Sequence, residues 1–254
     1  MRAIQFSEYG SYDTLQRVEL PQPIPEPGQI VVKMTAAAIN PLDNLMRQGR
    51  VNFGQRPPLI LGNEGAGVIA TEGSDLPVGT RVMLRRAYHL PRGGTWQEYV
   101  LAPRQAVEPL PDGTSDLEAA AMRTAYDTAY MALTYRGGFQ PGQVVFAPAV
   151  GSSVANAVIQ LGRILGAERV ITTASSSAKA RYARGLGYED VIDLSQESIR
   201  DGIAHLTKNA GVDLVIDGMD GRCLTDSQTT GARCDARLAT CRQARRIAYL
   251  CPCG

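Results

Sequence analysis

The sequence has no cysteine before Cys223, so neither a disulfide nor a thiolate metal site can form within the preceding residues. It has only two histidines, His89 and His205. Its 26 basic and 25 acidic side chains leave a net charge of +1, which gives no electrostatic reason to bind nucleic acid or an anionic membrane. No apolar run approaches the ~18–20 residues that span a bilayer, and the charged first residues lack the apolar core of a secretory signal. We therefore expect a cytoplasmic protein with no nucleic-acid and no membrane partner.

The most regular stretch of the sequence alternates strands and helices between Gln143 and Asp193. Gln143–Ala147 is an apolar run of strand length, and apolar residues recur at helical spacing in Val154–Leu165. Gly166 stands where a helix C-terminal cap belongs, and Arg169–Thr173 is a second, β-branched strand. Strands that alternate with helices of this length predict a parallel sheet.

The turn after the first of these strands consists of small residues. It lies at a helix N-terminus, where free backbone N–H groups and the helix dipole favour a bound phosphate. The full dinucleotide fingerprint has three glycines, whereas here Gly151 is joined by Ser152, Ser153 and Ala155. A plain strand–helix–strand unit with a compact turn is the alternative. We predict that Gly151, Ser152, Ser153 and Val154 bind the pyrophosphate of a dinucleotide.

Residues 1–115 have a different pattern, in which short alternating segments are separated by Pro/Gly turns. This pattern predicts an antiparallel barrel or sandwich. The predicted strands include Met1–Phe6, Ile30–Thr35, Gly65–Ala70, Arg81–Leu84 and Gln97–Leu101. Ser115 and Glu118 form a predicted capping box at the start of a helix over Asp116–Leu133. We therefore place a β domain at 1–115 and the parallel-sheet domain at 116–218.

The segment 219–254 departs from this organisation. A further central strand is predicted at Val212–Asp217, but the segment after it holds all the cysteines, six arginines, no lysine and no sustained apolar period. We interpret this tail as the product of a shifted reading frame or a truncated gene. The alternative is a small metal or redox motif at Cys251-Pro252-Cys253, for which no paired partner motif is present.

Six strings occur in the order found in one known superfamily. They are Asn40–Asp43 (NPLD), Pro58–Val68 (PLILGNEGAGV), Val78–Val82 (VGTRV), Gly94–Val100 (GTWQEYV), Thr124–Tyr130 (TAYDTAY) and the strand–turn–helix at Gln143–Leu165. Over roughly residues 1–218 the chain resembles the medium-chain dehydrogenase/reductase superfamily. Within it, the chain is most similar to the zinc-free quinone oxidoreductase (zeta-crystallin-like) branch. The resemblance implies an α/β protein with an added β domain: a GroES-like antiparallel barrel followed by a Rossmann-type parallel sheet, the latter incomplete.

The same resemblance argues against zinc. Zinc members place a Cys and a His-Glu pair as catalytic ligands, but the corresponding positions here are Asn40 and Asn63. Neither amide suits a site built for thiolate and imidazole. His89 and His205 fall outside these motifs, so we expect no metal.

The end of the second parallel strand indicates the cofactor. NAD-binding folds carry an acidic residue there for the ribose 2′-hydroxyl, whereas Thr172–Lys179 has hydroxyls, one ammonium and no carboxylate. Ser175 and Lys179 suit a 2′-phosphate, and by resemblance Lys179 falls where quinone oxidoreductases place a phosphate-binding lysine. A tyrosine common in the third strand region of that branch is Leu194 here. A solvated Lys179 is the alternative, and we predict NADPH.

By resemblance, Asn40, Asp43 and Thr128 face the nicotinamide end of the interdomain cleft, although Asp43 also suits a structural role at a helix start. Hydride transfer depends mainly on geometry. Without zinc to stabilise developing charge, acceptors that delocalise electrons are favoured, namely quinones or α,β-unsaturated carbonyls. Tyr126 or Tyr130 can donate a proton, but helix-spaced aromatics are more often core residues, so we assign no catalytic residue.

The resulting prediction is a zinc-independent NADPH-dependent oxidoreductase of a small-molecule quinone or enone. One alternative is a non-catalytic remnant that at most binds nucleotide, and another is an enoyl or 2-alkenal reductase. For an intact family member, the resemblance implies a homodimer.

Overall fold

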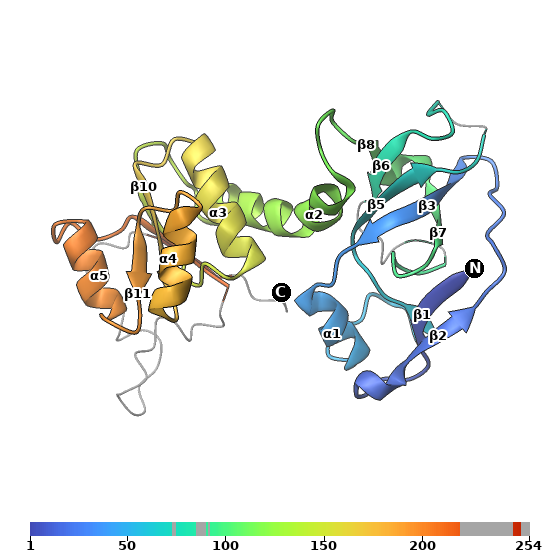
Figure 1. Ribbon diagram of the computed structural model, residues 1–254, viewed down its shortest axis with the longest axis horizontal. Coiled ribbons are helices and arrows are strands. Elements are labelled where there is room, and N and C mark those ends of the chain that lie inside the picture. The colour runs from blue at the N-terminus through green and yellow to red at the C-terminus, as the bar shows by residue number, and fades with distance from the viewer. Residues whose placement is uncertain (73–74, 85–89, 91, 219–245, 250–254) are drawn as a thin grey trace. The chain divides into compact units, whose positions relative to one another are not determined.

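The chain divides into two compact units, Met1–Thr124 (unit 1) and Ala125–Gly254 (unit 2) (Figure 1). The computed structural model describes residues 1–72, 75–84, 90, 92–218 and 246–249. His89, the five cysteines and the Cys-Pro-Cys motif therefore lie outside the described residues, as does most of the tail interpreted as a shifted reading frame.

Unit 1 is built from antiparallel strands in two sheets, as the Pro/Gly-punctuated pattern predicts. One sheet has the order β2-β1-β4 and the other the order β7-β3-β5-β6-β8. In the larger sheet, Val32 of β3 lies opposite both Ile69 and Val100, and all three are buried in one apolar cluster. The strands are β1 (Arg2–Phe6), β2 (Leu15–Glu19), β3 (Gln29–Ala37), β4 (Leu59–Ile60), β5 (Gly65–Ile69), β6 (Arg81–Leu84), β7 (Tyr99–Pro103) and β8 (Val107–Pro109).

Helices and 3₁₀ turns accompany these strands in the described part of the unit. The short helix α1 (Pro41–Arg47) begins with a proline, whose fixed φ suits a first helical position. The 3₁₀ turns are Tyr12–Thr14 and Arg104–Ala106. The helix α2 (Asp116–Met131) runs on into a π-helical turn, Ala132–Arg136.

The start of α2 confirms the predicted capping box. The N–H of Ser115 donates to Glu118 Oε2 at 2.8 Å, and the N–H of Glu118 donates to Ser115 Oγ at 3.2 Å. The division between the two units falls within α2, after Thr124. The predicted domain limits of 1–115 and 116–218 stay a prediction.

Unit 2 contains a parallel sheet of order β11-β10-β9-β12-β13. From β9 the chain proceeds outward through β10 to β11, then returns to place β12 on the other side of β9. The direction of winding therefore reverses between β9 and β12. The strands are β9 (Val144–Phe146), β10 (Arg169–Ala174), β11 (Val191–Asp193), β12 (Leu214–Asp217) and β13 (Arg246–Tyr249).

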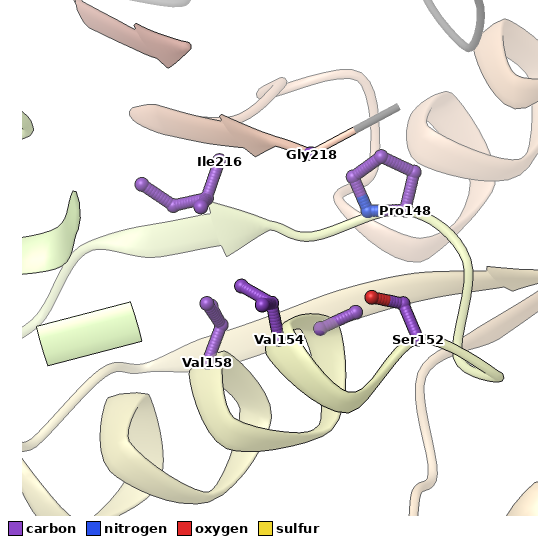
Figure 2. A pocket seen from close by; sticks show the side chains of 7 residues that line it. Pro148, Ser152, Val154, Val158, Ile216 and Gly218 are labelled. Carbon is purple, nitrogen blue, oxygen red and sulfur yellow. The ribbon is translucent and has the colours of Figure 1, made fainter. Parts of the chain in front are cut away.

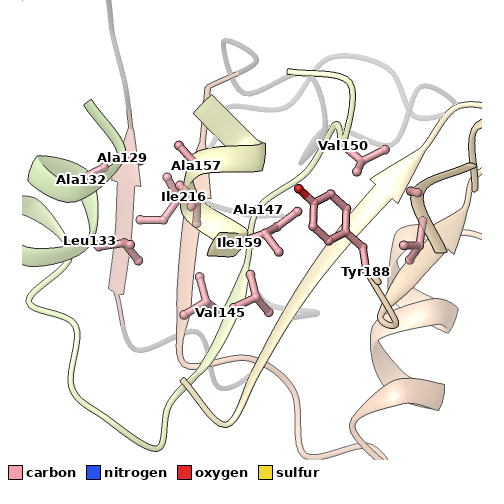
Figure 3. Close-up of a cluster of buried hydrophobic side chains, with 14 of the residues drawn as sticks. Ala129, Ala132, Leu133, Val145, Ala147, Val150, Ala157, Ile159, Tyr188 and Ile216 are labelled. Atoms are coloured by element: carbon pink, nitrogen blue, oxygen red, sulfur yellow. The ribbon is translucent and has the colours of Figure 1, made fainter. Parts of the chain in front are cut away.

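Helices pack on both faces of this sheet because adjacent strand residues point to opposite sides. Val145 belongs to the apolar cluster that includes residues of α2, α3 and α4 (Figure 3). Its neighbour Phe146 belongs to a second cluster with Ile171, Ile192 and residues of α5. The crossover helices are α3 (Ser153–Ile164), α4 (Ser177–Gly185) and α5 (Ile199–Leu206). Gly166, with φ of +89°, takes the left-handed conformation expected of its predicted capping position.

The predicted fold class is confirmed: an antiparallel β unit is followed by a parallel sheet of Rossmann type. The strands β2, β4, β8 and β13 were not among those named from the sequence. Arg246–Tyr249 pairs in parallel with Leu214–Asp217 as β13, but its four residues are too few to show a periodic pattern. The strand predicted at Gln97–Leu101 lies two residues later, at Tyr99–Pro103.

Candidate functional site

The turn between β9 and α3 is held in place by the neighbouring strand β10. The N–H of Ala149 donates to Thr173 Oγ1 at 2.9 Å, and the N–H of Val150 donates to the Thr173 carbonyl at 2.8 Å. Ala149 has a left-handed φ of 67°, which is uncommon for a residue with a side chain. The N–H of Ser152 returns to the Ala149 carbonyl at 2.8 Å and closes the turn. The predicted phosphate-binding residues therefore lie on an anchored turn and on the first residues of α3.

The first residues of α3 are well suited to an anion. Ser152 is the N-cap of α3, but its side chain makes no capping hydrogen bond. By contrast, Ser176 and Ser198 at the starts of α4 and α5 each accept a backbone N–H. The first N–H groups of any α-helix lack intrahelical partners. The N–H groups at the start of α3 thus remain free of the N-cap side chain, and the helix dipole favours negative charge there.

A small cavity lies beside this helix start, between the ends of β9 and β12 (Figure 2). It measures about 10 Å³, enough for roughly one water molecule. The residues lining it are Pro148, Ser152, Val154, Ala155, Val158, Ile216 and Gly218. The order of strands reverses between β9 and β12. Open α/β folds bind their ligands at such a point, at the edge of the sheet formed by the carboxyl ends of the strands.

The carboxyl end of β10 presents the predicted 2′-phosphate residues together. Lys179 Nζ donates to Ser175 Oγ at 3.0 Å, and both residues are exposed. The Ser176 hydroxyl accepts the N–H of Lys179 at 3.4 Å and caps α4. An ammonium and a hydroxyl at one exposed helix start can hold a phosphate dianion.

A carboxylate that the sequence prediction did not consider lies on the adjacent strand. Asp193 is paired with Ala174 at the ends of β11 and β10, and it is 7% exposed. The hydroxyls of Ser177 and Ser195 donate to it and hold the pKa of this carboxyl below its usual value. The Ser195 N–H also donates to Asp193 Oδ1 at 3.0 Å. The sequence signal for this residue was its position directly after the apolar pair Val191-Ile192, at the end of a strand.

In unit 1, Asp43 makes the contacts of a structural residue at a helix start. Its Oδ2 accepts the N–H of Asn40 at 2.6 Å, and its Oδ1 accepts the N–H of Gly62 at 2.9 Å. Asp43 is 1% exposed. Gly62 has φ of +104°, and a Cβ there would lie 2.8 Å from the backbone nitrogen of Thr95, so only glycine fits. The carboxylate thus fastens α1 to the glycine-rich string around Gly62.

Asn40 belongs to a second polar cluster, centred on a residue that the sequence prediction missed. Asn40 Nδ2 donates to Glu64 Oε1 at 3.0 Å, and the N–H of Thr124 donates to Glu64 Oε2 at 2.7 Å. Asn63 Nδ2 donates to Thr124 Oγ1 at 3.1 Å. Glu64 is 2% exposed. A single carboxylate within the apolar and glycine-rich string LILGNEGAGVI was the signal for a buried charge.

The amides at the positions of the family's zinc ligands do not fit zinc. The side-chain nitrogens of Asn40 and Asn63 are both hydrogen-bond donors within this cluster. Zinc sites of proteins are built from thiolate, imidazole and carboxylate. Among the described residues, no three His, Cys, Asp or Glu side chains are grouped closely enough to hold a metal ion.

The remaining predicted residues lie on α2. Thr128 belongs to unit 2, whereas Asn40 and Asp43 belong to unit 1. Tyr130 is 46% exposed. The hydroxyl of Tyr126 donates to Gln160 Oε1 at 2.7 Å. Burial, followed by the neighbouring Tyr188, raises the pKa of Tyr126.

Two protein-family models match the chain. The alcohol dehydrogenase GroES-like domain matches residues 26–112, and the zinc-binding dehydrogenase model matches residues 153–234. Their order is that of the two units described above. The chain belongs to the medium-chain dehydrogenase/reductase family, as the six sequence strings indicate.

Individual relatives support this membership. The human synaptic vesicle membrane protein VAT-1 homolog is 34% identical over 87% of the chain, which corresponds to 56% of that protein. The structure of an NAD-dependent alcohol dehydrogenase superposes with a TM-score of 0.82 at 26% identity, covering 98% of this chain and 84% of that one. A Bacillus thuringiensis protein assigned as an NADPH:quinone reductase gives a TM-score of 0.73 at 30% identity, covering 87% and 67% of the two chains.

The chain spans about half the length of the curated VAT-1 relatives that it matches. No helix in the described part of the chain is both long and apolar enough to cross a membrane.

Proposed function

We propose that the chain is an NADPH-dependent, zinc-independent reductase that transfers hydride to a quinone or an α,β-unsaturated carbonyl compound. The observation that carries the proposal is the anchored turn at the reversal point between β9 and β12. There the uncapped start of α3 meets the edge of the sheet at which open α/β folds bind ligands. The family membership supports a nicotinamide cofactor at this edge.

The residues present fit a dinucleotide phosphate. The backbone N–H groups of Gly151, Ser153 and Val154 would bind its pyrophosphate, with the Ser152 hydroxyl beside them. Ser175 and Lys179 would bind the 2′-phosphate, since their polar atoms already lie 3.0 Å apart on an exposed helix start. The relative assigned as an NADPH:quinone reductase supports this choice, while the NAD-dependent relative makes nucleotide preference a matter for direct measurement.

The proposed chemistry places few demands on acid or base groups. Bound NADPH supplies a hydride from C4 of its nicotinamide, and together with one proton this hydride reduces a quinone to a hydroquinone or saturates the C=C bond of an enone. Asn40 and Thr128 are proposed to orient the nicotinamide. Asp43 would contribute by holding the helix start that carries Asn40. Because Asn40 and Asn63 stand where zinc-dependent members of the family have thiolate and imidazole ligands, the site would present no Lewis-acidic metal to a simple ketone. Acceptors that delocalise the incoming electrons are therefore preferred.

A substrate panel tests the proposed reaction. NADPH oxidation would be followed at 340 nm with a benzoquinone, an enone, a 2-alkenal and a saturated ketone as acceptors. We expect oxidation with the quinone or the enone and none with the saturated ketone. Turnover restricted to the 2-alkenal would indicate an alkenal reductase instead. Turnover of the saturated ketone as fast as that of the quinone would contradict the expectation that the site holds no Lewis-acidic metal.

A second candidate is a protein that binds nucleotide without turnover. The observation that favours it is the matched length, about half that of the VAT-1 relatives. Nucleotide binding with no oxidation of NADPH by any acceptor would identify this case. The homodimer implied by resemblance stays a prediction, which the molecular mass in solution would check.

A further inference from the structure

Four side chains of unit 2 form a hydrogen-bond chain that runs from α2 to the turn before α3. The Tyr126 hydroxyl donates to Gln160 Oε1 at 2.7 Å. Gln160 Nε2 donates to the Tyr188 hydroxyl over a longer distance of 3.4 Å. The Tyr188 hydroxyl donates in turn to Asn156 Oδ1 at 2.8 Å. Each hydroxyl or amide therefore donates to the next group, and the chain has one direction.

The chain ends on two carbonyls of the turn. Asn156 Nδ2 donates to the carbonyl of Ser152 at 3.0 Å and to the carbonyl of Val150. The amide of Asn156 can do this only in one orientation. If it were rotated by 180°, its oxygen would face two carbonyl oxygens and its NH₂ group would face the Tyr188 hydroxyl. The two carbonyls require this orientation, and the Tyr188 hydroxyl reinforces it, because it already accepts from Gln160 and donates its own proton to Oδ1.

Holding these two carbonyls also fixes two N–H groups. In a planar trans peptide the C=O and the following N–H point in opposite directions. When Asn156 holds the Val150 carbonyl, the Gly151 N–H is directed away from Asn156. The Ser152 carbonyl and the Ser153 N–H are related in the same way. Gly151 and Ser153 are both exposed, so an anion can reach this part of the turn.

Tyr188 is itself held rigidly. It is 8% exposed and packs in the same apolar cluster as Ala147 and Val150 (Figure 3). The guanidinium carbon of Arg163 lies 5.6 Å from the centre of its ring, within the range of a cation–π contact. Core packing thus fixes the position of the hydroxyl, which holds the Asn156 amide through its hydrogen bond to Oδ1.

We propose that Asn156, oriented by Tyr188, is a positioning residue that aims the N–H groups of Gly151 and Ser153 at the cofactor's pyrophosphate. The identity of the ligand rests on the proposed function. The positioning of the turn does not, because the hydrogen bonds exist within the chain alone. A freely rotating Val150–Gly151 peptide would present its carbonyl to a phosphate part of the time, and the resulting repulsion would weaken binding.

The test compares Tyr188→Phe with Tyr182→Phe in the full chain. Both remove one hydroxyl, but Tyr182 is 71% exposed on α4 and has no role in this hydrogen-bond chain. Without any nucleotide, we expect Tyr188→Phe to accelerate amide hydrogen exchange of the Val150 and Ser152 N–H groups about threefold to tenfold, the equivalent of one ordinary hydrogen bond. Tyr182→Phe should leave that exchange unchanged.

Nucleotide binding gives the second readout. The Kd values of NADPH and of ADP should both rise about threefold to tenfold in Tyr188→Phe, because the two ligands share a pyrophosphate. Asn156→Asp should weaken both further, since it replaces the donor by a second acceptor. For an active chain, KM for NADPH should rise with kcat nearly unchanged.

Unchanged exchange at the turn in Tyr188→Phe, or equal acceleration in Tyr182→Phe, would overturn the positioning role. A lowered melting temperature with unaltered exchange and Kd would show that Tyr188 serves only the core. If the unaltered chain binds neither NADPH nor ADP, the proposed function fails, while the exchange comparison still decides whether Asn156 and Tyr188 position the turn.

Discussion

The side-chain nitrogen of Asn40 donates a hydrogen bond of 3.0 Å to the carboxylate of Glu64, which is 2% exposed. The other carboxylate oxygen accepts the N–H of Thr124 at 2.7 Å. A buried carboxylate is tolerated because donors satisfy it. The bond therefore joins the start of α1 to the start of β5 and fixes the amide that occupies a ligand position in the zinc-dependent members of the family.

Replacing this carboxylate by an amide should destabilise unit 1. In Glu64→Gln, an NH₂ group must face either Asn40 Nδ2 or the Thr124 N–H, so two donors oppose each other. We expect a loss of about 1–3 kcal/mol in the free energy of unfolding, measured by urea denaturation. The same change at the exposed Glu8 is the matched control and should have almost no effect. Equal stabilities for the two variants would mean that the Glu64 contacts contribute nothing net.

A negative charge at the start of α3 should prevent NADPH binding without lowering the thermal stability of the chain. Ser152→Asp supplies a good N-cap next to the positive end of the helix dipole, so the melting temperature should rise or stay the same. The same carboxylate would occupy the space of the pyrophosphate and repel it, so the thermal shift caused by NADPH should disappear. Ser198→Asp, the equivalent change at the N-cap of α5, should retain that shift. A normal shift in Ser152→Asp would place the phosphates elsewhere.

Lys179 should determine which nicotinamide nucleotide is preferred. Removing the charge in Lys179→Gln should raise the Kd of NADPH about tenfold or more and leave the Kd of NADH almost unaltered, because only NADPH carries the 2′-phosphate. Isothermal titration at two salt concentrations would measure both values. The exposed Lys208 provides the control substitution, Lys208→Gln. Parallel changes for the two nucleotides would show that Lys179 does not contact the 2′-phosphate.

Asp193 should make the stability of unit 2 sensitive to acid. The hydroxyls of Ser177 and Ser195 hold its pKa below the usual value in the folded state, so its stabilising effect is fully present above the unfolded pKa of about 3.9. That effect is lost as the pH falls through the lower, folded pKa. Melting curves between pH 6 and about pH 2.5 should show a steeper loss for the unaltered chain than for Asp193→Asn. Identical pH profiles would contradict this role.

Much of the fold followed from patterns that are local in sequence. The periodic segment Val154–Leu165 predicted α3 to within one residue at each end, and Ser115 with Glu118 predicted the start of α2. These features depend on contacts between residues close in the chain. The β13 strand did not follow, because a four-residue edge strand is defined by its partner β12 more than by its own pattern.

The residues of the candidate site also fall into those that local sequence indicates and those that only the tertiary structure reveals. The turn residues around Ser152 and the pair Ser175–Lys179 were accessible because they lie next to predicted strand ends. Glu64, Asp193 and Asn156 were missed, since each depends on a partner that is distant in sequence: Thr124 for Glu64, Ser177 for Asp193 and Tyr188 for Asn156. A single sequence shows that a polar residue lies within an apolar run, but only the tertiary structure shows which donors and acceptors satisfy it.

The most direct test of a nucleotide site in this chain is a thermal melt of the purified protein, alone and with saturating NADPH or NADH. A ligand that binds only the folded state at 100 times its Kd adds about 2.7 kcal/mol of stability. We expect one cooperative transition, whose midpoint temperature NADPH raises clearly and NADH raises less. No shift with either nucleotide would contradict the proposed function, because it would mean that the turn at Ser152 and the pair Ser175–Lys179 do not form a nucleotide site in this chain.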